Sequence, residues 1–210
     1  MGRGCVTDMA QPKSALGHLL KPGQTPREGD GEAGLVIQEQ PNVAQLQVIT
    51  RKNQSASLAR QLSSFLGVKK ALAPLVGADT GSIHIYATGP IEHWVFSAQH
   101  NASELEKQFA EALGDTASLF DQTHGRFVVR ISGDDATRLL AKGTSLDLDE
   151  GAFPAQGASH TTIEHLPALV VRRANPACFE LSVPRSYAGS LLTWFTVAAE
   201  EFGYSAEPSI

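Results

Sequence analysis

Residues 82–121 read SIHIYATGPIEHWVFSAQHNASELEKQFAEALGDTASLFD. Two segments of this stretch, 82–87 and 93–98, have strand character. They are separated by Thr88-Gly89-Pro90, a composition typical of a turn between antiparallel strands. The first part of the stretch therefore predicts two antiparallel strands joined by a short turn.

The second part of the stretch predicts a helix and a further strand. Ser103 can cap the helix, and Gly114 ends it. Apolar residues recur at helical spacing on its inward face, namely Leu105, Phe109, Ala112 and Leu113. Residues 118–121 then predict one more short strand.

The residues ahead of this stretch predict strands and another helix. Strand character extends over 35–39 and 43–50. Ser55 or Ser57 can cap the helix that follows, and Gly67 suits its left-handed end; its apolar face is Leu58, Leu62, Phe65 and Leu66. From residue 43 to residue 121 the order is strand, helix, strand, strand, helix, strand. This is the split βαβ arrangement, in which two helices cover one face of an antiparallel sheet.

The remaining residues predict the same arrangement again. Strands are expected over 126–132, 159–165, 168–172 and 179–183. One helix begins at Asp134 or Asp135 and another runs over 186–202. Duplication is also supported by similar residues at matching places, Gly89-Pro90 and Trp94-Val95-Phe96-Ser97 against Asn175-Pro176 and Phe179-Glu180-Leu181-Ser182.

We therefore expect an α+β fold made of two tandem split-βαβ, ferredoxin-like halves. They form one pseudo-symmetric body, with antiparallel sheets and helices on one face of each. The expected division is an N-terminal arm and linker over 1–34, a first half over 35–121 and a second half over 122–210. In the arm, residues 15–20 are a short apolar segment that can dock on this chain or on a partner. The linker, residues 21–34, is rich in Pro, Gly and charge.

Composition limits the classes of function. The formal net charge of -5 argues against a surface for nucleic acid, which needs clustered Lys and Arg. Cys5 and Cys178 form no CxxC pattern, so we expect neither a disulfide framework nor a thiolate zinc site, and a reducing cytoplasm suits the chain. Since no apolar run approaches the roughly 18 to 20 residues of a membrane span, we expect no membrane partner.

The sequence lacks several common motifs of catalysis. It contains no GxxxxGK[ST], GxSxG or HExxH, so it predicts no P-loop, nucleophile elbow or helical metal pair. His84 stands between Ile83 and Ile85 and is expected on the outward face of its strand. His160 and His165 are an odd number of residues apart, which predicts opposite faces of a strand.

The remaining reactive side chains have ordinary structural roles. Cys178 precedes an apolar strand, where a buried free thiol is the common role. Asp134 and Asp135 are expected at a helix start, and the acidic residues of 147–150 in a loop. We therefore assign no catalytic, cofactor-binding or metal-binding residue to this chain.

The last predicted helix has an unusually wide apolar face, made by Tyr187, Leu191, Leu192, Trp194, Phe195, Val197, Ala198, Ala199 and Phe202. Such a face is typical of a helix with contacts on two sides. One interpretation is that it contacts another subunit through Leu192 and Trp194. The other is that it is deeply buried within this chain.

A series of motifs in the last ninety residues resembles the gamma subunit family of heterotetrameric sarcosine oxidase. They are Asp121-Gln122-Thr123-His124-Gly125-Arg126, Val129-Arg130-Ile131-Ser132-Gly133, Leu140-Ala141-Lys142-Gly143, Leu146-Asp147-Leu148, Phe153, Phe179-Glu180-Leu181, Val183-Pro184-Arg185-Ser186-Tyr187-Ala188 and Glu200-Glu201-Phe202-Gly203-Tyr204. They cover most of residues 121–204 in order. The resemblance also implies a fold similar to the folate-binding domain of aminomethyltransferases.

The resemblance implies a non-catalytic, accessory role in an oxidoreductase. That complex oxidatively demethylates sarcosine to glycine, with formation of hydrogen peroxide and 5,10-methylenetetrahydrofolate. Its FAD, FMN, NAD, zinc and tetrahydrofolate are implied to lie on other subunits, and none on this chain. The implied partners are the alpha, beta and delta subunits, with the large alpha subunit in direct contact. The alternatives are a free-standing folate-binding one-carbon protein and an unrelated scaffold subunit.

Overall fold

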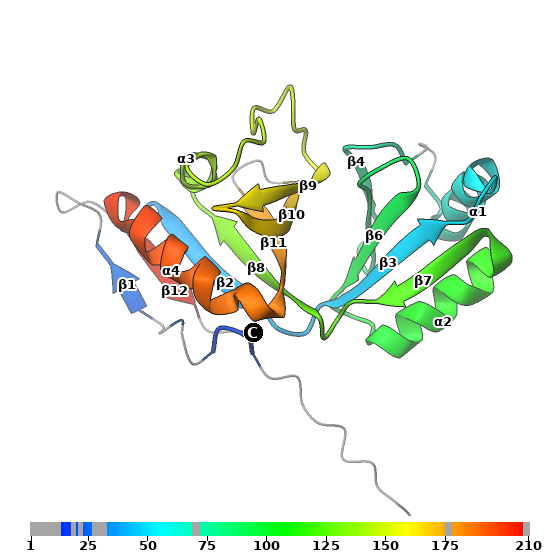
Figure 1. Cartoon of the computed structure of the whole chain (residues 1–210), viewed down its shortest axis with the longest axis horizontal. Helices are drawn as coiled ribbons and strands as arrows, with labels where there is room; N and C mark the ends of the chain where they lie inside the picture. The colour runs from blue at the N-terminus through cyan, green and yellow to red at the C-terminus, as the bar shows by residue number, and fades with distance from the viewer. Residues whose placement is uncertain are drawn as a thin grey trace, which may run out of the picture.

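The computed structural model describes residues 14–17, 20, 23–26, 33–68, 72–174 and 178–207. Two β-sheets lie beside each other, and the helices cover the faces that the sheets turn away from each other (Figure 1). The predicted α+β class, with mainly antiparallel sheets, is confirmed.

The five-stranded sheet has the order β4-β5-β6-β3-β7, and all its pairs are antiparallel. Its elements are β3 (Ala44–Thr50), α1 (Ser55–Leu66), β4 (Val76–Asp79), β5 (His84–Ala87), β6 (Glu92–Ser97), α2 (Ala102–Leu113), η1 (Gly114–Thr116) and β7 (Ala117–Asp121). Without β4, this is the predicted split βαβ unit. Strand β4 was not predicted because its residues, VGAD, lack an apolar alternation.

The seven-stranded sheet has the order β1-β12-β2-β8-β11-β10-β9. Its elements are β1 (Gly23–Thr25), β2 (Leu35–Gln40), β8 (Arg126–Ser132), α3 (Ala136–Ala141), β9 (Ala158–Ile163), β10 (Leu166–Arg172), β11 (Cys178–Pro184), η2 (Arg185–Tyr187), α4 (Ala188–Ala198), η3 (Glu200–Phe202) and β12 (Tyr204–Glu207). Strands β1 and β12 were not predicted. The first lies in the segment interpreted as a linker, whose residues 21, 22 and 27–32 lie outside the described part of the chain.

Strand β2 differs most from expectation, because we counted it with the first half. It lies in the other sheet, where it pairs antiparallel with β8 and parallel with β12. Gly133 permits this close approach: a Cβ there would stand 2.2 Å from the carbonyl oxygen of Gly34, and its φ of +116° favours glycine. The strand's apolar residues predict that it is buried, but they do not predict which sheet it joins. The sequence therefore could not reveal that β2 pairs with β8 and β12.

Three apolar clusters hold the layers together. One lies between α1, α2 and the five-stranded sheet, with Leu58, Leu62, Leu105 and Phe109 at its centre. A larger one lies under α3 and α4 on the seven-stranded sheet. The third joins the two sheets through Tyr86, Trp94, Phe96, Val128, Ala158, Leu169 and Val171. The inner faces of the two halves therefore pack against each other.

The starts of two helices and one turn differ from the predictions. Helix α2 is capped by Asn101 in a capping box with Glu104, not by Ser103, and α1 begins after Gln54, whose side chain makes no cap bond. Gly67 ends α1 in the left-handed conformation, as predicted. Strand β9 ends at Ile163 because Glu164 and His165 take positive φ angles in the turn to β10.

Of the N-terminal apolar segment, residues 15–17 and 20 are described and pack on their own chain, while residues 18 and 19 lie outside the described part. Leu16 is fully buried in the cluster beneath α4. The backbone amides of Ala15 and Leu16 donate to the Glu39 carboxylate at 2.7 and 3.0 Å, and the Ser14 hydroxyl donates to it as well. Glu39 lies in β2, so these hydrogen bonds attach residues 14–16 to that strand.

Candidate functional site

Polar side chains from the two sheets meet at the contact between the two halves. Its centre is apolar: Trp94 and Phe96 of β6 stack with ring centroids 6.3 Å apart and meet Leu169 of β10. Polar groups lie on either side of this centre. They come from strands far apart in the sequence.

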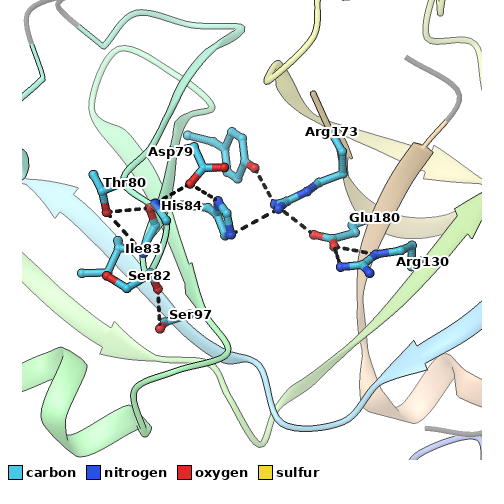
Figure 2. Close-up of polar contacts among 11 residues, drawn as sticks. Asp79, Thr80, Ser82, Ile83, His84, Ser97, Arg130, Arg173 and Glu180 are labelled. Carbon is cyan, nitrogen blue, oxygen red and sulfur yellow. Dashed lines mark hydrogen bonds and ion pairs between the residues drawn. The ribbon is translucent and has the colours of Figure 1, made fainter. Parts of the chain in front are cut away.

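One polar group is a chain of contacts through Arg173, shown in Figure 2. From the first half, the Tyr86 hydroxyl lies 3.1 Å from Arg173 Nη1 and His84 Nε2 lies 3.2 Å from Arg173 Nη2. From the second half, Glu180 Oε2 lies 3.5 Å from Arg173 Nη1. Glu180 Oε1 in turn accepts from Arg130 Nε and Nη2 at 3.1 and 2.7 Å. Arg173 therefore joins β5 to β11.

His84 is the titratable group at the centre of this arrangement. Its Nδ1 lies 3.2 Å from Asp79 Oδ1, and its side chain is 19% exposed. Burial lowers the pKa of His84, and the nearby Arg173 guanidinium lowers it further. Asp79 and Glu180 act in the opposite direction but do not outweigh these effects. Burial also raises the pKa of Tyr86, so its hydroxyl stays protonated.

The second polar group surrounds Glu92 on β6. Its carboxylate accepts from Thr88 Oγ1 at 2.7 Å and from Gln47 Nε2 at 2.5 Å, and lies 3.0 Å from His160 Nε2 of the second half. Burial alone would raise the pKa of Glu92, but the hydrogen bonds from Thr88 and Gln47 and the charge of His160 together lower it.

A third set of contacts lies next to these residues. The Arg126 guanidinium stacks over the Trp94 ring at 5.1 Å from its centroid and donates to Ser182 Oγ at 2.8 Å. Ser182 Oγ donates in turn to Gln45 Oε1 at 2.5 Å. Since Trp94 and Gln45 belong to the first half and the other two residues to the second, the Arg126–Trp94 and Ser182–Gln45 contacts cross the interface.

These contacts join the two halves of the chain. Not every buried polar atom among the described residues is satisfied, since His84 Nδ1, His93 Nδ1 and Trp94 Nε1 have no hydrogen-bond partner. Among the described residues, no group of three or more His, Cys, Asp or Glu side chains could hold a metal ion. No helix in the same part of the chain is long and apolar enough to cross a membrane.

The histidines, the cysteine and the aspartate considered in the sequence have these positions in the structure. His84 is on the face opposite Ile83 and Ile85, as predicted, but that face meets the other half instead of solvent. His165 lies in a turn, so the comparison of strand faces with His160 does not apply. Cys178 is a half-buried free thiol whose pKa is raised by burial. Asp135 pairs with Arg138 at the start of α3.

The acidic loop and the last helix also have structural roles. Asp147 and Asp149 accept backbone amides within the predicted loop. In α4, Leu192 is only 8% exposed and belongs to the core, and the Trp194 ring packs on Gly143, where a Cβ would stand 2.4 Å from it. The interpretation of a helix buried within its own chain therefore holds for Leu192, whereas Trp194 is half-buried. Val197, 70% exposed, and Tyr187 are outward parts of the apolar face.

Sequence reasoning missed Arg173, Glu180 and Arg130. One signal was present: Arg130 and Glu180 interrupt apolar strands at alternating positions, which predicts a polar pair on one face. Their pairing depends on the register of β8 with β11, which places Arg130 opposite Glu180. That register is not readable from either strand alone.

Among solved structures, the chain is similar to a chain of the heterotetrameric sarcosine oxidase from Corynebacterium sp. U-96 in complex with pyrrole 2-carboxylate. The TM-score is 0.72 at 21% identity, over 90% of this chain and 95% of that chain. It is also similar to the glycine cleavage system aminomethyltransferase T from Bartonella henselae, with a TM-score of 0.58 at 13% identity, over 84% of this chain and 48% of that chain. No curated protein sequence matches the chain.

The family comparison agrees with the motifs between residues 121 and 204. A model of the sarcosine oxidase, gamma subunit family matches residues 53–201. The match includes four strands of the five-stranded sheet, whose motifs were not recognised from the sequence, and excludes the arm, β1, β2, β3 and β12. Because it spans more than half of the 210 residues, the chain belongs to the sarcosine oxidase, gamma subunit family.

Proposed function

We propose that this chain is a non-catalytic subunit of a heterotetrameric sarcosine oxidase, the complex that oxidatively demethylates sarcosine. The observation that carries the proposal is the family match over residues 53–201. The fold supports it, since the matched chain of the Corynebacterium enzyme is covered over 95% of its length. An accessory role is supported by the interface between the halves, where the ionisable side chains bind one another.

The proposal includes the partners and the location of the cofactors. The alpha, beta and delta subunits are the partners, with the large alpha subunit in direct contact. The FAD, FMN, NAD, zinc and tetrahydrofolate of the complex belong to those subunits. The complex is placed in the cytoplasm, which is supported by a sequence with two cysteines and no disulfide framework.

Co-expression tests the proposal. The full-length chain, tagged, is expressed with candidate flavoprotein subunits, and the eluted complex is assayed for flavin absorbance and for hydrogen peroxide formed from sarcosine. We expect co-elution with a flavin-containing complex that oxidises sarcosine, and neither flavin nor activity in the chain alone. A chain that never co-elutes with such a complex contradicts the proposal.

A second function, folate binding by the isolated chain, is favoured by the fold shared with the aminomethyltransferase. Calorimetric titration of the full-length chain with tetrahydrofolate discriminates between the two. Saturable binding by the isolated chain favours the one-carbon protein. We expect none.

A further inference from the structure

We propose that the contact between the two halves is a pH-sensitive clasp, closed while His84 is neutral and loosened when His84 gains a proton. This device lies beyond the role of an accessory subunit, because it concerns how the two halves of this chain are held to each other. It is built from the contacts of His84, Arg173 and Glu180 (Figure 2).

The geometry requires a neutral imidazole. Arg173 has only N–H donors, so the 3.2 Å contact from Arg173 Nη2 is a hydrogen bond only if His84 Nε2 offers its lone pair. The ring proton then resides on Nδ1, which lies 3.2 Å from the Asp79 carboxylate. The contact of Nε2 with Arg173 therefore selects one tautomer of neutral His84, in which Nδ1 lies near Asp79 without a hydrogen-bond partner.

A second proton on the ring reverses the contact with Arg173. Nε2 then carries a hydrogen that faces another donor, and two positive groups stand 3.2 Å apart. Arg173 must move, and its contacts with Tyr86 and Glu180 depend on the same guanidinium. One proton therefore weakens the contacts that join β5 to β11.

The other charged groups around His84 set the pH at which this occurs. Asp79 on β4 and Glu180 on β11 favour the protonated ring, and Arg173 disfavours it. Tyr86 on β5 stays neutral because burial raises its pKa, and Arg130 on β8 acts through its bond to Glu180. Burial and Arg173 prevail, so the pKa of folded His84 lies below its ordinary value of 6.5.

The sign of the pH effect follows from this direction. His84 binds a proton more tightly when its contact with Arg173 is broken than when that contact is formed. Acidification therefore favours the broken contact. The stabilisation is complete above the ordinary pKa of 6.5 and is lost as the pH falls through that value toward the lowered one. The apolar contact around Trp94 and Leu169 has no titrating group, so the halves loosen at one side and remain joined at the centre.

The other histidine contact between the halves has a different partner. His160 Nε2 lies 3.0 Å from a carboxylate oxygen of Glu92 instead of a guanidinium. Replacement of His160 is therefore a matched control for replacement of His84. Each variant removes one histidine that joins the two halves.

The test is urea unfolding of the full-length chain between pH 8 and pH 5, for the wild type, His84→Gln and His160→Gln. Glutamine can accept from Arg173 through Oε1 and does not titrate. We expect the equilibrium constant for unfolding to rise several-fold less on acidification in His84→Gln than in the wild type. In His160→Gln, which keeps the contacts of His84, the rise should remain larger than in His84→Gln. A His84→Gln chain with the wild-type pH dependence overturns the proposal.

An NMR titration of the His84 ring keeps the test decisive if His84→Gln does not fold. Asp79→Asn removes a group that favours the protonated ring, so the midpoint of His84 should move to lower pH. Arg173→Met removes one that disfavours it, so the midpoint should move to higher pH. The wild-type midpoint should lie below 6.5. A midpoint at or above that value, or one that neither variant shifts, contradicts the clasp.

Discussion

At the scale of single residues, Glu39 holds the N-terminal arm to the body of the protein. The residue is 2% exposed, and its carboxylate accepts hydrogen bonds from Ser14, Ala15 and Leu16. Glu39→Gln keeps the size of the side chain but replaces one acceptor oxygen with a donor amide. Since hydrogen bonds to a charged group contribute about 1.5 to 3 kcal/mol each, we expect the free energy of unfolding to fall by about 2 kcal/mol.

The release of the arm can be measured separately from global stability. In Glu39→Gln, limited proteolysis should cleave near Leu16 faster than in the wild type, because a buried segment becomes accessible. Glu111→Gln, an exposed site on α2, is the control and should change neither quantity. Equal cleavage rates in all three proteins would show that the arm does not depend on Glu39.

At the scale of elements, helices α1 and α2 differ in how their N-termini are capped. The Asn101 side chain accepts from the Glu104 amide at 2.9 Å, and the Glu104 side chain accepts from the Asn101 amide at 3.2 Å. Asn101→Ala should therefore lower the free energy of unfolding by about 1 kcal/mol in urea titrations. Gln54→Ala, at the start of α1, is the matched control and should have little effect because that side chain makes no cap bond. Equal losses in the two variants would contradict the role of the capping box.

The elements also show how far the sequence could predict this structure. Apart from β4, the strands and helices between residues 43 and 121 followed from apolar spacing, because Leu58, Leu62, Leu105 and Phe109 bury the faces that their periodicity predicts. Contacts between strands did not follow, since the place of β2 between β8 and β12 depends on which strands meet in space. For the same reason the pairing of Glu180 with Arg130 and Arg173 could not be predicted.

At the scale of the whole molecule, the five-stranded half is inserted into the seven-stranded one. The chain passes through β2, builds the whole five-stranded sheet from β3 to β7, and then returns at β8 beside β2. A fragment of residues 43–122 keeps all strands of its sheet and the cluster beneath α1 and α2. A fragment of residues 122–210 lacks β2, which separates β8 from β12.

The two fragments should therefore behave differently. Residues 122–210 alone lose Leu16, Leu35 and Ile37 from their core, and at about 1.5 to 3 kcal/mol for each buried side chain this approaches the whole stability of a typical domain. We expect dispersed amide signals in the two-dimensional NMR spectrum of fragment 43–122 and collapsed signals for fragment 122–210. A peptide of residues 14–40 added to the second fragment should restore dispersion, whereas the same peptide with Ile37→Asp should not, because a carboxylate would occupy a fully buried apolar site. A dispersed spectrum of fragment 122–210 without the peptide would show that β2 is dispensable, and that the interleaving of the chain does not determine how this half folds.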